Sequence, residues 1–252
     1  MVGKMKIYVA SLSGGKDSVA MVLRLIKEKK PLDYVVFYDT GMEFKAVYEV
    51  IRQMQEIVES NGIKFVYLQS DTNFLVDMLI KPVKERDTGN IHYGYDWCGG
   101  CTRWRTSKKV ECINRFYKSL DGEIVQYVGF AADEQDRFKE EENTLYPLAE
   151  WGMTEADALE YCFNQGIHWI ENGIELYSIL KRVSCWCCKN KNLEELKNIW
   201  WYLPYYWELL KGLQSRIDRP FHDQMTIFDL EKRFIAEGHQ IGFLDLQMGA
   251  NQ

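Results

Sequence analysis

The stretch that decides the fold is KIYVASLSGGKDS, residues 6–18. Its first part, 6–12, is a short apolar run of the kind that forms a buried strand. Gly14 and Gly15 follow, and two glycines between a strand and a helix let the backbone turn tightly and approach a ligand. Residues 17–29 then carry apolar side chains at helical spacing. The stretch therefore predicts a strand, a glycine turn and a helix that begins at the turn.

The start of that helix is suited to phosphate, because it offers unpaired N–H groups and the positive end of the helix dipole. Ser13 and Ser18 can donate their hydroxyls, and Lys16 can supply a cation. Asp17 can cap the helix, orient the loop, or help hold a Mg²⁺ whose other ligands are phosphate oxygens. The turn is not a Walker A loop, because the G-x-x-x-x-G-K-[ST] spacing is missing. We therefore predict a phosphate loop of a different kind.

Further apolar runs rich in β-forming residues occur at 34–38, 64–69 and 124–130. A helical pattern at 43–60 separates the first two of them. This alternation predicts an α/β fold, in which a parallel twisted sheet is flanked by helices in a Rossmann-like arrangement. Ligands of such sheets bind at the carboxyl ends of the strands, and both the glycine turn and Asp39 fall there.

The rest of the chain is organised less clearly. Residues 84–100 carry charges, glycines and aromatics and are typical of a long loop, and from Thr154 onward the pattern is helical and aromatic without clear strands. We expect a nucleotide-binding α/β domain over 1–150 and a helical, aromatic-rich region over 151–252. The aromatic run at 200–207 is more typical of a core than of a surface that stacks on nucleobases.

Composition and charge limit the cellular compartment and the classes of partner that we expect. The formal net charge of −6 argues against non-specific binding to a nucleic-acid backbone, although four basic residues gather on one short segment. No apolar run is long enough to span a bilayer, and the N-terminus lacks the features of a signal peptide. We therefore expect a cytoplasmic protein without a membrane partner, whose seven cysteines are thiols or metal ligands. The basic segment contains Arg103, Arg105, Lys108 and Lys109.

Two groups of cysteines can supply four thiolates to one centre. The first is Cys98 and Cys101 in CGGC, and the second is Cys185, Cys187 and Cys188 in CWCC. Four thiolates suit either a structural Zn²⁺ or a [4Fe–4S] cluster. The ligands that we expect are one pair from each group, Cys98 with Cys101 and Cys185 with Cys188, while Cys187 is an alternative ligand.

Several motifs resemble those of a known family. SGGKDS resembles the PP-loop of adenine nucleotide α-hydrolase-like enzymes, and the chain more narrowly resembles the phosphoadenosine phosphosulfate (PAPS) reductase family. YDTGMEF at 38–44 is similar to that family's D-T-G-x-E-F segment. VGFAADE at 128–134 is similar to its G-x-R-x-D-E segment, with an aromatic or a small residue where a basic one is often found. YPLAEW at 146–151 is similar to its Y-P-L-x-x-W element.

The resemblance implies that the nucleotide lies over the strand ends, with Lys16 and Asp17 as the catalytic residues. It implies a nucleotide site made of Ser11, Ser13, Gly14, Gly15, Lys16, Asp17, Ser18, Asp39, Thr40, Gly41, Gly129 and Asp133. Residues that could bind a sulfate or phosphate group of the substrate are Arg103, Arg105, Lys108 and Arg137. The adenylylsulfate-reducing branch of the family holds a [4Fe–4S] cluster between two cysteine groups, which favours the cluster over Zn²⁺, although the order of the pair types is swapped in this chain.

The resemblance also limits the reaction. Reductases of this family attack the sulfonucleotide with a cysteine near the C-terminus, and no cysteine follows Cys188 in this sequence. We therefore expect a transferase of the ATP pyrophosphatase type. It would bind ATP with Mg²⁺, adenylate an oxygen of an acceptor and release pyrophosphate, so that a sulfur or nitrogen nucleophile can displace AMP. Sulfur transfer fits a cysteine-bound centre. Related tRNA-thiolating and DNA-phosphorothioating enzymes suggest a nucleic acid as one class of acceptor.

Two other functions stay open. The first is reduction of adenylylsulfate or PAPS, with electrons supplied by a cysteine of the second group or by an electron-donor protein. The second is a non-catalytic, nucleotide-binding adaptor in which a structural Zn²⁺ holds a partner.

Overall fold

The computed structural model describes residues 5–85, 87–99, 103–138 and 141–249, with side chains up to residue 238. The chain forms two compact units, each built from two separate segments. Unit 1 comprises Met1–Asp71 and Arg105–Cys185, and unit 2 comprises Thr72–Trp104 and Trp186–Gln252. This division differs from the expected boundary near residue 150, because the segment after that residue packs onto the first helix of unit 1.

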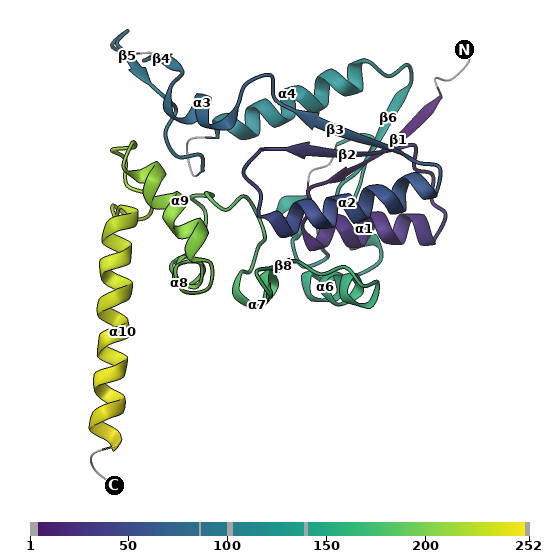
Figure 1. Cartoon of the computed structure of the whole chain (residues 1–252). Helices are drawn as coiled ribbons and strands as arrows, with labels where there is room; N and C mark the ends of the chain where they lie inside the picture. The colour runs from purple at the N-terminus through teal and green to yellow at the C-terminus, as the bar shows by residue number, and fades with distance from the viewer. Residues whose placement is uncertain (1–4, 86, 100–102, 139–140, 250–252) are drawn as a thin grey trace. The chain divides into compact units, whose positions relative to one another are not determined.

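Unit 1 is built on a parallel sheet with the strand order β3-β2-β1-β6-β7 (Figure 1). The strands are β1 (Lys6–Leu12), β2 (Tyr34–Asp39), β3 (Lys64–Gln69), β6 (Glu123–Tyr127) and β7 (Thr144–Leu145). In the central strand, Val9 is paired with Tyr34 on one side and with Gln126 on the other. The predicted α/β fold and its first four strands are confirmed. The strand β7 is too short for a sequence pattern to show it.

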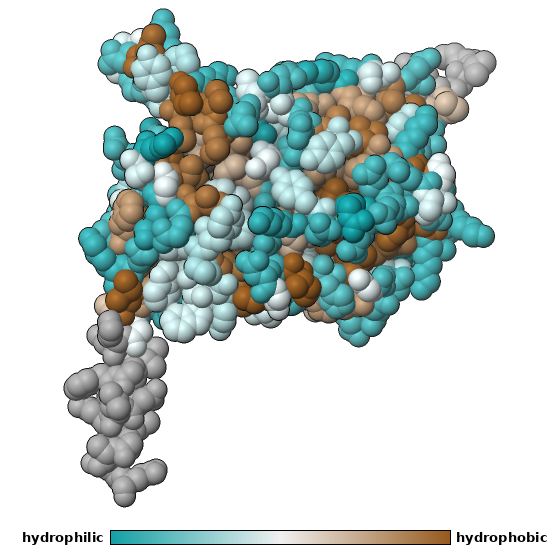
Figure 2. Space-filling view, viewed as in Figure 1, coloured by the Kyte–Doolittle hydropathy of each residue, from teal (hydrophilic) through white to brown (hydrophobic). Residues whose placement is uncertain are grey.

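Helices cover both faces of this sheet, with α1 and α2 on one side and α4 on the other (Figure 1). Phe116 and Tyr117 of α4 pack against the buried Ile7 and Val9 of β1. On the outer face of α2, Arg52 pairs with neighbouring glutamates, and hydrophilic side chains cover that face (Figure 2). The helices are α1 (Lys16–Lys27), α2 (Lys45–Ser60), α4 (Trp104–Lys118), α5 (Pro147–Glu150), α6 (Glu155–Asn164) and α7 (Leu176–Ile179), with a 3-10 turn at Gln135–Arg137.

The segment from residue 151 to 185 completes unit 1. Its helix α6 begins at a capping box, in which Thr154 and Asp157 each accept a hydrogen bond from the other's backbone N–H, as the cap signal predicts. We expected no strands after Thr154, and this prediction is wrong, because β8 (Ile170–Glu171) and β9 (Ile174–Glu175) form a small antiparallel pair. The indole of Trp169 donates to the carbonyl of Gly14 at 2.7 Å and ties this segment to the glycine turn.

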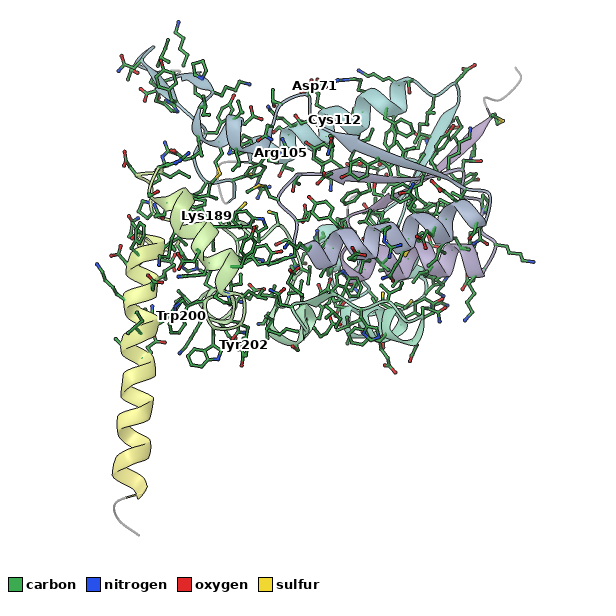
Figure 3. The ribbon with its side chains drawn as sticks, in the orientation of Figure 1. Asp71, Arg105, Cys112, Lys189, Trp200 and Tyr202 are labelled. Atoms are coloured by element: carbon green, nitrogen blue, oxygen red, sulfur yellow. The ribbon has the colours of Figure 1, made fainter. Side chains whose placement is uncertain are left out.

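Unit 2 contains a hairpin where we expected only a loop, formed by β4 (Pro82–Lys84) and β5 (Ile91–Tyr93). Its core includes Trp97, whose ring lies edge-on to Phe221 at a centroid distance of 4.6 Å. In the aromatic run, Tyr206 and Trp207 are buried, whereas Trp201, Tyr202 and Tyr205 are exposed; Figure 3 labels Trp200 and Tyr202. The helices are α3 (Phe74–Leu79), α8 (Leu193–Tyr202), α9 (Pro204–Gln214) and α10 (Ile227–Gly249). Within the described part of the chain, no helix has both the length and the apolar character needed to cross a membrane.

Candidate active site

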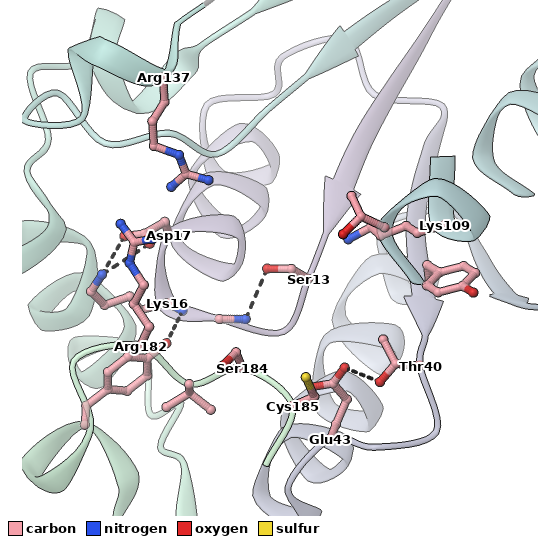
Figure 4. A pocket seen from close by; sticks show the side chains of 15 residues that line it. Ser13, Lys16, Asp17, Thr40, Glu43, Lys109, Arg137, Arg182, Ser184 and Cys185 are labelled. Carbon is pink, nitrogen blue, oxygen red and sulfur yellow. Dashed lines mark hydrogen bonds and ion pairs between the residues drawn. The ribbon is translucent and has the colours of Figure 1, made fainter. Parts of the chain in front are cut away.

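The candidate site lies where the order of the strands reverses. From β1 the chain continues to β2 and β3 on one side of the sheet, and β6 and β7 lie on the other side. The carboxyl ends of β1 and β6 therefore form the topological switch point at which such sheets bind ligands. A cavity of about 490 Å³ opens there, which is a size suited to a small molecule (Figure 4). The residues predicted for the nucleotide or the substrate that line it are Ser13, Gly15, Lys16, Asp17, Thr40 and Arg137.

The glycine turn at one side of the cavity has a fixed geometry. Gly14 has a φ of +81°, and a Cβ on it would lie 2.7 Å from Cγ1 of Val47, so a larger residue fits neither the backbone nor the space. The hydroxyl of Ser18 donates to the carbonyl of Gly15 and accepts from the N–H of Ser13, each at 3.0 Å. Ser18 is buried and stabilises the turn, whereas Ser13 faces the cavity.

The N-terminus of α1 points its backbone donors at the cavity. Gly15 is the N-cap residue, and no side chain caps the helix, so the possibility that Asp17 caps it is not realised. The Asp17 carboxylate instead accepts from Nζ of Lys16 at 3.0 Å. The buried Nζ also lies 3.4 Å from Glu155 of α6. Burial raises the pKa of the Asp17 carboxyl, and the neighbouring Lys16 opposes that shift.

Two arginines stand over this side of the cavity, and both pair with Glu134. Nη1 of Arg137 donates to its Oε1 at 2.6 Å, and Nη2 of Arg182 donates to the same oxygen at 2.9 Å. Burial alone would raise the pKa of Glu134, but the contacts with Arg137, the Ala131 N–H and Glu155 together outweigh it and leave this pKa below its ordinary value. The Arg137 guanidinium also lies 4.1 Å from the ring centre of Phe130, so its position is set on two sides.

Three carboxylates at this place could hold a divalent cation. One oxygen from each of Asp17, Glu134 and Glu155 lies within 4.8 Å of the other two. Oxygen ligands of this kind, supplemented by phosphate oxygens, suit Mg²⁺. In the structure the same carboxylates are paired with Lys16, Arg137 and Arg182.

The opposite side of the cavity is formed by β2 and α4. Thr40 donates its hydroxyl to Oε1 of Glu43 at 2.7 Å, and Lys109 reaches the cavity from α4. Burial lowers the pKa of the Lys109 ammonium, and the Glu43 carboxylate partly opposes the shift.

Of the four basic residues in the segment 103–109, only Lys109 lines the cavity, and it is not one that we had assigned to the substrate. Arg105 is buried, and its Nη2 donates to the Thr40 carbonyl at 2.9 Å, so it positions the backbone after β2 (Figure 3). Arg103 is exposed and Lys108 is half-buried, and neither lines the cavity. Lys109 does, because it lies one turn after Arg105 on the same face of α4. That spacing in the sequence could have indicated Lys109.

Asp39 lies outside the cavity lining, and its acceptor capacity is used inside the protein. Its Oδ1 accepts from the N–H of Gly41 and the hydroxyl of Tyr48, each at 2.7 Å. Its Oδ2 accepts from the Tyr67 hydroxyl at 2.6 Å and from Nε2 of Gln69 at 2.8 Å. Burial would raise the pKa of Asp39, but these hydrogen bonds outweigh it and lower the pKa. Asp39 therefore holds the ends of β2 and β3 together.

Other residues predicted for the nucleotide lie behind the lining. A Cβ on Gly129 would lie 3.0 Å from Cα of Ser18, so the glycine allows the loop after β6 to approach α1 closely. The carboxylate of Asp133 accepts from the N–H of Glu155 at 3.1 Å, at the start of α6. Ser11 lies within β1, and Gly41 has a φ of +78° in the turn after β2.

One segment of the cavity wall was not predicted. No motif covers it, because it follows the last element of the family resemblance and ends at the second cysteine group. Its lining residues are Tyr177, Arg182, Val183 and Ser184, and the adjoining Cys185, which we predicted only as a metal ligand, lines the cavity as well.

Cys98 of the first cysteine group and Cys187 and Cys188 of the second belong to unit 2. Gly99 has a φ of +148°, and a Cβ on it would lie 2.9 Å from Cβ of Lys189, so the loop after Cys98 lies against the residue after Cys188. Cys98 and Cys188 are half-buried, and Cys187 is buried. This close approach fits a centre shared by the two groups. Cys101 lies outside the described residues and Cys185 belongs to unit 1, so the four-cysteine centre stays a prediction.

Comparison with known proteins identifies the family of the chain. The family model "phosphoadenosine phosphosulfate reductase domain" matches residues 7–171. The uncharacterized protein MJ0066 of Methanocaldococcus jannaschii is 24% identical over 218 residues, and the match covers 81% of this chain but 40% of that protein. The chain thus spans less than half the length of this curated relative.

Among solved structures, the U34-tRNA thiolase NcsA from Methanococcus maripaludis, determined with its [4Fe-4S] cluster, has a TM-score of 0.44 at 13% identity. The superposition covers 93% of this chain and 72% of that one. A similarity at this level carries no information on activity. The family match supports an enzyme domain that uses an adenine nucleotide, and it covers more than half of the sequence. The chain belongs to the phosphoadenosine phosphosulfate reductase family, within the PP-loop superfamily.

Proposed function

We propose that this chain binds ATP with Mg²⁺ and adenylates an oxygen of an acceptor, releasing pyrophosphate, so that sulfur can replace that oxygen. The observation that carries the proposal is the convergence of α1 and four cations on one cavity. The cations Lys16, Lys109, Arg137 and Arg182 line it together with two carboxylates, Asp17 and Glu43, in a chain whose net charge is −6. A polyanion is the ligand that such a lining stabilises.

In the proposed reaction the acceptor oxygen attacks the α-phosphorus of ATP, the bond to the bridging oxygen of the β-phosphate breaks, and pyrophosphate leaves. A donor of sulfide-level sulfur then forms the new bond to carbon, and AMP leaves with the former acceptor oxygen. Lys16 and the N–H groups of α1 would neutralise the leaving pyrophosphate, and Arg137 and Arg182 would orient the phosphates. Mg²⁺ held by Asp17, Glu134 and Glu155 would add charge neutralisation.

The cysteine groups fit a sulfur-handling role. Cys98 and Cys188, with Cys101 and Cys185 as the further predicted ligands, would hold a [4Fe–4S] cluster, which would supply the site of sulfur transfer; Zn²⁺ on the same thiolates would be structural. The acceptor, for which a nucleic acid is the class we favour, and the sulfur donor are separate partners. Anaerobic purification with iron, sulfide and zinc analysis separates the two centres. About four irons per chain support the cluster, and one zinc without iron refutes it.

The nucleotide reaction is tested by binding and by product analysis. The wild-type chain should bind MgATP in calorimetry and convert it to AMP and pyrophosphate when pools of tRNA or DNA are supplied. Lys16→Gln should abolish both, whereas Lys27→Gln, an exposed change at the other end of α1, should leave both intact. Absence of ATP binding, or formation of ADP and phosphate, would refute the proposal.

A second candidate is sulfonucleotide reduction, which the family description names and which one observation favours. The thiol-bearing residue Cys185 lines the cavity, so a thiolate could attack the sulfur of bound adenylylsulfate and release AMP, leaving a thiosulfonate that a dithiol protein reduces to sulfite. Sulfite release from adenylylsulfate or PAPS with reduced thioredoxin would support it, and its loss in Cys185→Ser would assign the thiol. No sulfite with either substrate would eliminate this reaction.

A further inference from the structure

Tyr177 contacts a backbone N–H of the predicted phosphate loop, although it lies beyond the part of the chain that matches the family model. Its hydroxyl oxygen accepts the backbone N–H of Lys16 at 2.7 Å. Lys16 is the first residue of α1, so this N–H is one of the donors that a helix N-terminus offers to an anion. Tyr177 lies beyond residue 171, where the match to the family model ends.

The Tyr177 hydroxyl can also donate a hydrogen bond. A phenol oxygen can accept one hydrogen bond and donate another. Among the described residues, none accepts a hydrogen bond from the Tyr177 hydroxyl. Burial raises the pKa of Tyr177 well above its ordinary value, so the group is a neutral donor at physiological pH. Because Tyr177 lines the cavity, an oxygen of a ligand there can accept a hydrogen bond from its hydroxyl.

The ring is held firmly enough to serve as a fixed donor. It lies edge-on to Trp169 at a centroid distance of 4.8 Å, and Trp169 is itself hydrogen-bonded to the carbonyl of Gly14. The carboxylate of Glu175 accepts from the N–H of Trp169 and from the N–H of Tyr177, which fixes the start of α7. The hydroxyl is therefore connected to the glycine turn through Trp169, and packing and hydrogen bonds fix its position.

We propose that Tyr177 binds the nucleotide: its hydroxyl accepts the Lys16 N–H and donates to a phosphate oxygen, extending the phosphate loop by one donor. The inference rests on the proposed function, because it names a further residue of the same nucleotide site. The alternative is that the hydroxyl only fills the place of a phosphate and is displaced on binding. The two arrangements predict opposite effects of removing the hydroxyl.

The test is Tyr177→Phe, which keeps the ring against Trp169 and removes only the hydroxyl. If Tyr177 donates to phosphate, the Kd for MgATP measured by calorimetry should rise at least about tenfold, the range for a lost hydrogen bond to a charged group. Inorganic tripolyphosphate, which has no base or sugar, should show the same loss. Tyr202→Phe, an exposed tyrosine of α8, is the matched control and should bind like the wild type. Unchanged or tighter binding by Tyr177→Phe would overturn the proposal.

A purely structural role and a failure of the proposed function give different results. Loss of the bond to the Lys16 N–H should lower the thermal midpoint of ligand-free Tyr177→Phe by no more than a few degrees, so a larger fall that accounts for the lost binding would overturn the proposal. Should the variant not fold, nitration of Tyr177 in the wild-type protein decides: ATP should protect it, and equal nitration with and without ATP rejects the inference. If the wild type binds neither ATP nor tripolyphosphate, the proposed function itself fails.

Discussion

Replacement of Asp39 by Asn separates a structural from a nucleotide-binding role for this residue. The carboxylate accepts four hydrogen bonds, two on each oxygen. An asparagine keeps its Oδ1 opposite the N–H of Gly41, which cannot reverse, and so turns its NH₂ toward Tyr67 and Gln69. Those two side chains can become acceptors only by rotating. The hydrogen bonds that remain no longer involve a charged acceptor.

The expected loss follows from those changes. A hydrogen bond to a charged group contributes about 1.5–3 kcal/mol and a neutral one about 1 kcal/mol, so Asp39→Asn should lower the free energy of unfolding by about 2–4 kcal/mol. The pH dependence has a defined sign. Because the pKa of Asp39 is lowered in the folded state, its stabilisation is present above the unfolded pKa of about 3.9 and is lost as pH falls through the folded pKa. The difference between variant and wild type should therefore shrink below about pH 4.

Urea unfolding at several pH values measures both effects, and calorimetry with MgATP measures the site. Asp71→Asn is the control, because Asp71 is an exposed carboxylate paired with Arg115 and should change stability by less than about 1 kcal/mol. The reasoning would be refuted if Asp39→Asn unfolded like the wild type but lost ATP binding. That result would make Asp39 a direct ligand of the nucleotide.

Two further substitutions test the cavity wall at Arg182 and the close approach of the loop after β6 to α1 at Gly129. Arg182→Ala should weaken MgATP binding by about tenfold or more while changing stability by no more than about 1 kcal/mol, because the Arg182 side chain is exposed and the buried Glu134 keeps its ion pair with Arg137. Arg115→Ala removes an exposed ion pair elsewhere and should leave both ATP binding and stability nearly unchanged. Equal ATP affinities of Arg182→Ala and the wild type in titration would remove Arg182 from the site. Gly129→Ala places a Cβ 3.0 Å from Cα of Ser18 and should cost about 1–3 kcal/mol of stability and weaken ATP binding. Gly212→Ala, in a helix and with nothing within 4 Å of the added atom, should instead stabilise the chain by up to about 1 kcal/mol in the same unfolding assay.

The fold of unit 1 could be predicted because its signals are local. The run before Gly14 and the helical spacing after Lys16 each depend on a few neighbouring residues, and the alternation of such runs limits the topology to a parallel sheet. The strand β7 and the pair β8 and β9 gave no such signal, because two-residue strands have no period to detect. Their formation depends on neighbours that are distant in the sequence.

The same contrast applies to the site. Motif residues such as Ser13, Lys16 and Thr40 lie in the cavity wall, since the loops that carry them directly follow strands whose ends converge. Asp39 belongs to a motif as well, but its role is decided by Tyr48 and Tyr67, two hydroxyls whose approach the sequence does not show. A motif therefore indicates where a carboxylate lies, and only the surrounding donors decide whether it faces inward or toward a ligand.

The segment from Tyr177 to Cys185 shows how this member of the family could acquire its own specificity. The family domain supplies the glycine turn and α1, which recognise a phosphate chain and leave the rest of the ligand open. The following segment adds a hydroxyl on the first N–H of α1, a guanidinium beside Glu134 and a thiol in the same wall. On the function that we propose, these groups would lie where the phosphates and an incoming acceptor meet. A change at Arg182 would then alter ligand choice without disturbing the turn at Gly14, whereas a change at Tyr177 would also remove a contact of the phosphate loop.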